Sequence, residues 1–384
     1  MALELIAACR EGRFDTVQLC LDNGADVDET DDTGASPLSI VCEYGTGVGA
    51  TEVATLLVDR GADIQLADKD GYSPLFIACA EDKVGLATLL LDRGADINQS
   101  SVVGASPLYE ACARGCINAA TLLLDRNADI DRAEVKGTTP IYIAIERGQL
   151  SVARLLLSRG ANVHLAHRRH RMTPLHVACQ QRRADAVPLL LDRGAAVRLL
   201  LDHGADVHTV ENGGATPLWY TCYYGFADLT RLLLDAGSEV DLQDKMSSPL
   251  SIACHKGHFG PARLCLERGA DYKLMDQSGL TPRQTARSQG HPAMAAWLER
   301  IEESGWKRYL SGPRYELVAL RELVARGRAR RLRAFSQKEQ LLDFLFPGNQ
   351  PTKPHKRAKR GLPSLQRRPL PARRALLLGR RAGA

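Results

Sequence analysis

One pattern of apolar and polar residues recurs along this chain at a nearly constant interval. Each copy opens with a Ser-Pro or Thr-Pro pair, and the prolines are Pro37, Pro74, Pro107, Pro140, Pro174, Pro217, Pro249 and Pro282. Successive prolines are 37, 33, 33, 34, 43, 32 and 33 residues apart. A period near 33 residues in a chain of 384 predicts a stack of small structural units rather than one compact core.

Each copy predicts two helices and a turn. Proline is accepted at the first position of a helix because its missing N–H has no intrahelical partner there, and the preceding Ser or Thr can cap the helix. Four residues later most copies have a small residue, such as Ala111 or Ala144, where we expect neighbouring helices to pack closely. The second helix carries three consecutive leucines and ends at a glycine such as Gly94, or at Asn127, where a left-handed backbone is favoured. A polar turn then leads to the next proline.

These residues resemble the ankyrin repeat. Residues 173–178 read Thr-Pro-Leu-His-Val-Ala and match the family's Thr-Pro-Leu-His-x-Ala signature in full, whereas the other copies replace the histidine. The resemblance implies an all-α ankyrin-repeat solenoid of helix-turn-helix units with extended turn tips, and it implies that partners bind the concave face formed by the turn tips and first helices. We expect the array to span residues 1–306, with an N-terminal unit at 1–31 and repeats one to eight at about 32–68, 69–101, 102–134, 135–168, 169–211, 212–243, 244–276 and 277–306.

Two interruptions break the period. Repeat one has about four extra residues around Gly45–Gly49, which we expect to form a loop between its helices. Repeat five contains a tandem copy, in which residues 189–198 are followed by the closely similar residues 199–208. Ten residues do not make whole turns at about 3.6 residues per turn, so both leucine triplets cannot share one face of an unbroken helix. We therefore expect one copy to loop out or pack poorly and the stack to split near Leu201.

The charge divides the chain into an acidic body and a basic end. Residues 307–384 hold 21 Lys and Arg against 4 Asp and Glu, a net charge of +17, which leaves −12 in residues 1–306 out of the total of +5. Apolar spacing and a capping box at Ser336 predict a short helical pair in residues 307–350. From Pro351 the chain has 11 basic and no acidic residues among prolines and glycines, so we expect a disordered basic tail at 351–384.

Sequence motifs give no indication of catalysis. The chain lacks phosphate-binding, zinc-protease and nucleophile-elbow motifs and has no Cys-x-x-Cys, so we expect no enzyme, no cofactor and no metal site. Seven of the ten cysteines recur at one position of the first helix, once per repeat, which favours buried side chains over a cluster of ligands. Neither a signal peptide nor a membrane span is evident. Free thiols fit a cytoplasmic protein, with the nucleus as an alternative.

Variable positions of the first helices and turns are the candidate contacts for another protein. They are Arg114, Glu146, Arg147, Arg168, Arg169, His170, Arg171, Gln180, Gln181, Tyr223, Tyr224, His255 and Lys256, mainly in repeats four to seven. The basic turn at 167–171 beside Tyr223 and Tyr224 favours an acidic, partly apolar segment, because arginine and aromatic side chains dominate binding hot spots. The alternative is a solvated loop next to tyrosines that only pack between helices. Trp219 and Tyr220 lie nearer the helix start and are expected in the core.

The predicted function is that of a monomeric, non-catalytic adaptor or scaffold. Two alternatives use the C-terminal region. Residues 314–346 loosely resemble the box with which some ankyrin adaptors recruit a ubiquitin ligase, although the expected cysteine and Leu-Pro-rich segment are missing. A basic run at Lys356, Arg357, Lys359 and Arg360 is typical of a nuclear-import signal or a nucleic-acid contact.

Overall fold

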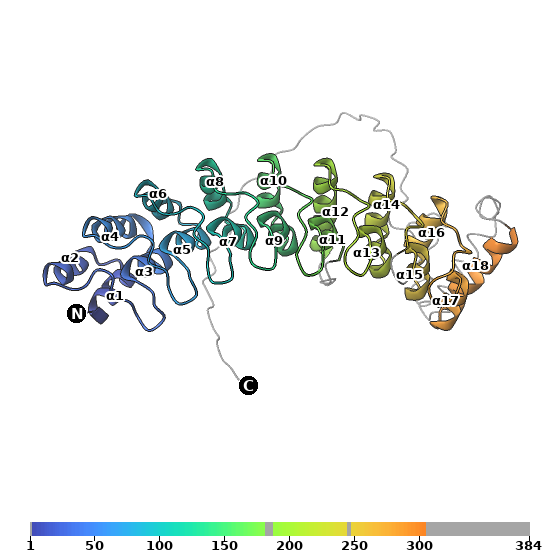
Figure 1. The fold of residues 1–384 in the computed structure, drawn as a ribbon, viewed down its shortest axis with the longest axis horizontal. Helices are drawn as coiled ribbons and strands as arrows, with labels where there is room; N and C mark the ends of the chain where they lie inside the picture. Colours follow the sequence, from blue (N-terminus) through green and yellow to red (C-terminus); the bar gives the residue numbers. More distant parts are fainter. Residues whose placement is uncertain (1, 181–186, 244–246, 305–384) are drawn as a thin grey trace, which may run out of the picture. The chain divides into compact units, whose positions relative to one another are not determined.

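The computed structural model describes residues 2–180, 187–243 and 247–304, and the side chains at 2, 48 and 187–193 are not among those described. Within these residues the chain forms 18 α-helices and no strand (Figure 1). The predicted all-α repeat solenoid is confirmed. The helical pair expected at 307–350 and the basic tail expected at 351–384 lie outside the described residues.

The first helix of every repeat begins at its proline. Ser36 illustrates why, because its side chain accepts a hydrogen bond from the backbone N–H of Ser39 at 3.2 Å while Pro37 occupies the first helical position. After the N-terminal helix α1 (Ala2–Glu11), the first helices are α3 (Pro37–Tyr44), α5 (Pro74–Ala80), α7 (Pro107–Arg114), α9 (Pro140–Arg147), α11 (Pro174–Gln180), α13 (Pro217–Tyr224), α15 (Pro249–Lys256) and α17 (Pro282–Ser288).

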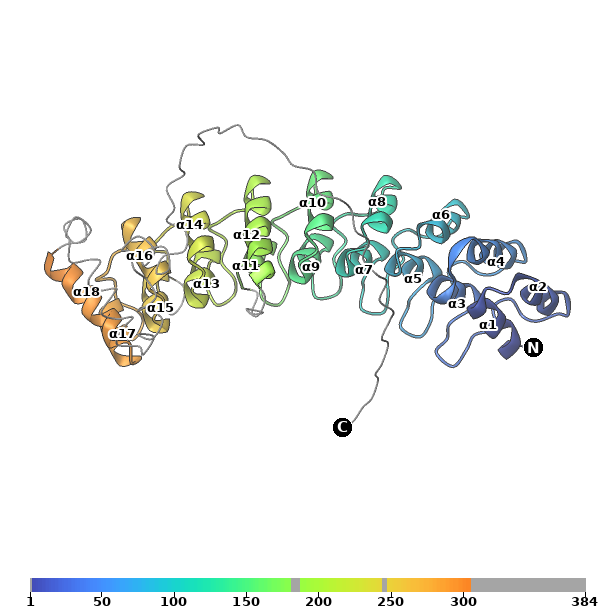
Figure 2. The ribbon, with the colours of Figure 1, turned by 180° about the vertical axis from the view of Figure 1, so that it is seen from behind.

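The second helices form a separate layer. They are α2 (Phe14–Asp22), α4 (Gly47–Asp59), α6 (Val84–Asp92), α8 (Ile117–Asp125), α10 (Leu150–Ser158), α12 (Val187–Asp202), α14 (Ala227–Asp235), α16 (Phe259–Glu267) and α18 (Pro292–Ser304). Figures 1 and 2 show the helix pairs side by side in chain order, with the turns projecting from the layer of first helices. Gly94 and Asn127 end their helices with φ of +89° and +63°, as predicted.

The core lies between the two layers and runs through every repeat. Ala111 and Ala144 are completely buried, as expected for positions where helices approach closely. Of each leucine triplet only the middle residue is fully buried, as at Leu90, Leu123 and Leu156. The recurring cysteines are buried free thiols. Burial raises the pKa of Cys42 to about 12, so this thiol stays protonated and packs as a small apolar side chain.

The loop and the split predicted for the tandem copy are not found, while the packing of the side chains at 189–193 lies outside the described residues. Helix α12 is continuous from Val187 to Asp202 and does not break near Leu201. The second copy takes the register of the other repeats, since Leu200 is fully buried, Leu199 is nearly so, and the helix ends before Gly204 at φ +79°. The extra residues therefore lengthen the helix at its start. Helices α9, α11 and α13 pack on one another in order, so the stack does not split.

The insertion in repeat one also differs from the expectation. The extra residues do not form a loop but belong to α4, which has 13 residues against nine in α6 and α8. Val53, Ala54 and Leu57 occupy the buried positions of this helix. The added turn lies at its start, so the buried face of the helix is unchanged.

Exposed ion pairs join the second helices of neighbouring repeats. Arg93 binds Asp59 at 2.8 Å and Arg126 binds Asp92 at 2.8 Å, with equivalent pairs at Arg60–Asp22, Arg159–Asp125 and Arg268–Asp235. The series is interrupted in repeats four to six. Ser158 replaces the aspartate in repeat four, and His203 and Ala236 replace the arginine in repeats five and six. Because such surface pairs contribute little, the buried layer rather than this series of pairs holds the stack together.

Candidate protein-binding groove

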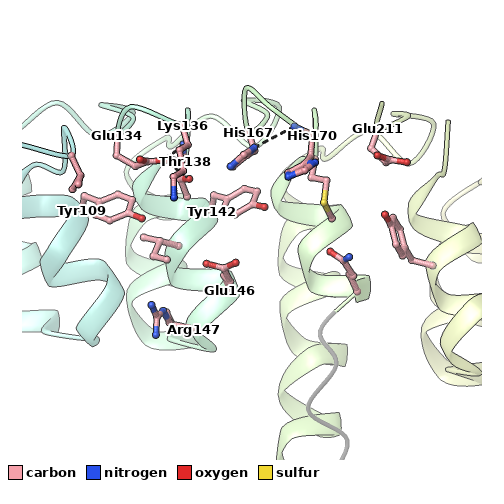
Figure 3. A pocket seen from close by; sticks show the side chains of 15 residues that line it. Tyr109, Glu134, Lys136, Thr138, Tyr142, Glu146, Arg147, His167, His170 and Glu211 are labelled. Atoms are coloured by element: carbon pink, nitrogen blue, oxygen red, sulfur yellow. Dashed lines mark hydrogen bonds between the residues drawn. The ribbon is translucent and has the colours of Figure 1, made fainter. Parts of the chain in front are cut away.

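A groove of about 620 Å³ runs across the first helices and turns of repeats three to six. Among the residues that the structure describes, those lining it come from first helices and turns and none comes from a second helix. Its lining residues are Val103, Tyr109, Glu134, Lys136, Thr138, Tyr142, Ile143, Glu146, Arg147, His167, His170, Met172, Gln180, Glu211 and Tyr220. The groove thus collects side chains from four repeats onto one surface (Figure 3).

Tyrosines form the floor of the groove. Tyr109 and Tyr142 are the third residues of α7 and α9, the position that His176 occupies in α11. His176 is buried, and its imidazole bonds Thr173 Oγ1 at 2.8 Å and the carbonyl of Ala215 in the next turn at 3.2 Å. Tyr109 is half-buried, whereas Tyr142 is buried with 6% of its surface exposed, and both rings line the groove.

The tyrosine hydroxyls remain neutral at physiological pH. Burial, then the negative charges of Glu134 and Glu146, raises the pKa of Tyr109 to about 12. Burial also raises the pKa of Tyr142, with Glu146 adding to the effect. A neutral phenol offers an apolar ring and one O–H donor, and this combination suits a peptide segment with carbonyl or carboxylate oxygens.

The walls of the groove carry charges of both signs. Lys136, Glu146 and Arg147 are exposed, and Figure 3 shows the tyrosine rings between the turn residues and the Glu146–Arg147 end of α9. Glu134 is only 6% exposed and accepts the Thr138 hydroxyl at 2.6 Å. Burial would raise the pKa of Glu134, but hydrogen bonds from Lys136 and Thr138 outweigh burial and lower the pKa. This carboxylate is therefore ionised, and its hydrogen bonds stabilise the turn to which it belongs.

The turn at residues 167–171, the fifth in the chain because it precedes repeat five, is built on a histidine. The Nδ1 atom of His167 accepts the backbone N–H groups of Arg169 at 3.2 Å and His170 at 3.3 Å, and the His167 and His170 rings stack with centroids 5.2 Å apart. Burial and the neighbouring His170 lower the pKa of His167. A neutral ring with its proton on Nε2 therefore holds this turn.

The structure brings some of the predicted contact residues together and separates others. Glu146, Arg147, His170 and Gln180 line the groove. Arg168, Arg169 and Arg171 are exposed on the fifth turn beside it, whereas Gln181 lies outside the described residues. Arg114 is exposed but bonds Glu110 at 2.6 Å and Glu81 at 2.8 Å.

The remaining predicted contacts belong to an aromatic cluster next to the groove. Tyr223 and Tyr224 are half-buried, Tyr223 stacks on Trp219 at 5.1 Å, and Lys256 Nζ lies 4.5 Å from the centroid of the Tyr223 ring. His255 is half-buried on α15. Trp219 and Tyr220 were expected in the core, but they are half-buried like Tyr223 and Tyr224. Tyr220 also lines the groove.

Sequence reasoning missed Tyr109, Tyr142 and Lys136 as groove residues, whereas His167 belongs to the turn at 167–171 that it had singled out. The available signal was the replacement of the signature histidine by tyrosine in repeats three and four. A phenol has no ring nitrogen to accept from the preceding turn as His176 does, and both tyrosines line the groove.

Among the described residues no three His, Cys, Asp or Glu side chains are grouped so that they could hold a metal ion. No helix in the described part of the chain is both long and apolar enough to cross a membrane.

Comparison with known proteins gives one match. A family model described as ankyrin repeats (3 copies) matches residues 5–101, 48–134, 108–197, 171–244 and 194–276, which together cover most of the chain. A search of curated proteins finds no match. The matched residues include every repeat that lines the groove.

Proposed function

The chain belongs to the ankyrin-repeat family, whose repeats are general modules of protein–protein interaction, and we propose that it acts as a non-catalytic adaptor or scaffold. One observation carries this proposal. The groove of repeats three to six combines aromatic side chains and exposed charges on one surface, which is the composition of a protein-binding hot spot. Family members of this kind are typically non-catalytic.

The partner we propose is a protein segment that is acidic and partly apolar, bound by a single copy of the chain. Tyr109 and Tyr142 supply apolar rings, and Lys136 and Arg147 supply exposed positive charge next to them. Charge complementarity of this kind speeds association and selects among partners. The observation in favour of the cytoplasm or nucleus is that all ten cysteines are free thiols.

The two alternative functions, ligase recruitment through residues 314–346 and nuclear or nucleic-acid contacts through residues 351–384, fall on residues outside the described part of the chain. No contact, distance or charge of the described residues favours either of them. Protein binding at the groove is therefore the function that the described residues support.

The test selects random 14-residue segments, displayed on phage, for binding to the full chain. Selected segments are then measured against a groove variant, Lys136→Glu with Arg147→Glu, and a matched control, Arg154→Glu with Arg198→Glu, whose residues are exposed on α10 and α12. Both variants change the net charge equally. We expect the groove variant to weaken binding at least tenfold and the control to change it less than twofold.

Two results would contradict the proposal. The first is that no segment is enriched over an uncoated surface. The second is that groove and control variants weaken binding equally, because the charge of the whole array rather than the groove would then bind the segments. Thermal melts followed by circular dichroism check that both variants remain folded.

A further inference from the structure

The tips of the turns are not uniform in chemistry. The two residues at each tip are Asp32 and Thr33 before repeat one and Lys69 and Asp70 before repeat two. Before repeat three they are Val102 and Val103, 72% and 57% exposed, and before repeat four they are Val135, 62% exposed, and the exposed Lys136. Turns normally carry polar residues, and side chains this exposed gain little from packing within the chain. Three exposed valines on adjacent turns are thus an apolar patch that the fold itself does not need.

The fifth turn is basic and has no internal counter-charge. A carboxylate closes most of the other turns, as when Asp31 Oδ1 accepts the N–H groups of Thr33 and Ala35. In the fifth turn the neutral ring of His167 replaces the carboxylate and accepts the backbone N–H groups of Arg169 and His170. None of the guanidinium groups of Arg168, Arg169 and Arg171 forms an ion pair with any residue that the structure describes, so their positive charge is available to an anion.

Hydrogen bonds fix the apolar tips next to the basic one. Val135 N–H donates to the Val103 carbonyl at 3.0 Å, and Arg168 N–H donates to the Lys136 carbonyl at 2.8 Å. The third, fourth and fifth turns therefore form one continuous edge beside the groove. Neighbouring helices pack about 8–10 Å apart, so the third and fifth tips are separated by roughly 20 Å. An extended segment covers that distance in about six residues, at roughly 3.3 Å per residue.

We propose that these tips bind the same partner segment as the groove and determine its order of residues. Apolar side chains lie on the third and fourth tips, and Asp or Glu side chains lie on the fifth, about six residues from the third tip and about three from the fourth. The turn-tip surface consists of Val102, Val103, Val135, Arg168, Arg169 and Arg171. This inference rests on the proposed function, because the tips border the groove that holds the segment. It adds which residue types the partner must carry and how far apart they lie.

The experiment uses the segments selected on the full chain and two tip variants. The apolar variant is Val102→Ser, Val103→Ser and Val135→Ser, and the basic variant is Arg168→Gln with Arg169→Gln. All five side chains are exposed, so the variants should fold, and circular dichroism melts check this. Arg168→Lys with Arg169→Lys keeps the charge and serves as the matched control.

We expect enriched segments to carry an apolar cluster and an acidic cluster about three to six residues apart. Each tip variant should weaken their binding about tenfold, whereas the lysine control should weaken it less than threefold. Raising the salt concentration from 50 to 300 mM should weaken binding to the wild type more than binding to the basic variant.

The outcomes separate this inference from the proposed function. Segments that depend on Lys136 and Arg147 but bind both tip variants normally would overturn the tip surface and leave the groove in place. Enriched segments with no fixed spacing between apolar and acidic residues would overturn it as well. Binding of a random single-stranded DNA 20-mer that depends on Arg168 and Arg169 but not on the valines would show that the tip takes nucleic acid instead.

Discussion

The stability of the array should depend on the protonation of His176. The Nδ1 atom of this buried ring accepts the backbone N–H of Thr173 at 3.2 Å, so the proton is on Nε2, which donates to the Ala215 carbonyl at 3.2 Å. Protonating Nδ1 would remove an acceptor and place a charge inside the array. Burial accordingly lowers the pKa of His176 to about 4, from the ordinary value of 6.5.

The direction of the pH effect follows from that lowered pKa. Below pH 6.5 the unfolded chain takes up a proton at His176 that the folded chain does not, so stability is fully present above pH 6.5 and is lost as the pH falls toward about 4. Between pH 7.5 and pH 5.0 the loss amounts to about 2 kcal/mol.

The variant His176→Gln isolates this contribution. Gln284 occupies the same position in the last repeat, where its Oε1 accepts the Thr281 N–H at 2.9 Å, so glutamine keeps the hydrogen bond without titrating. Urea unfolding at the two pH values should show that the free energy of unfolding falls by about 2 kcal/mol more in the wild type than in the variant. Equal losses in the two proteins would refute the reasoning, as would an NMR titration giving His176 a pKa near 6.5.

Three further predictions test the packing. Deleting residues 188–197 should leave the thermal midpoint within about 3 °C of the wild type, because Ala186-Val187 then takes the place of Ala196-Val197 before Arg198 and the buried Leu200; a fall of more than 10 °C would contradict this. Leu123→Ala should lower the free energy of unfolding by about 2–5 kcal/mol, and Arg126→Ala by less than about 1 kcal/mol, in urea titrations. Iodoacetamide at pH 8 should label the half-buried Cys116 of the native protein well before the buried Cys112, as mass spectrometry of short exposures can establish.

The sequence was sufficient for the features that depend on a single repeat. Proline fixes the first helical residue, glycine or asparagine ends the second helix, and a cysteine recurring every 33 residues is buried. These features are local, so each repeat supplies the same physical reason. The family resemblance added the stacking of the units, which one repeat alone cannot specify.

Features that depend on several repeats were predicted less well. The tandem copy was expected to break α12 because both leucine triplets were assumed to need one buried face. The helix instead uses Ala196, Val197 and Leu200 for packing and extends at its start. The centre of the groove was likewise hard to locate, because it depends on how the Tyr109 and Tyr142 rings meet the turns of other repeats.

Two neutral histidines, His167 in the turn before repeat five and His176 in its first helix, link stability and recognition. His176 ties α11 to the turn of repeat six, and His167 closes the turn that carries the basic tip. Both rings accept backbone N–H groups through Nδ1, so acid weakens both contacts. The same protonation adds positive charge beside Arg168 and Arg169, which strengthens attraction for an acidic segment. Acid thus acts in opposite directions on folding and on the proposed binding, and the two effects originate within ten residues of one another.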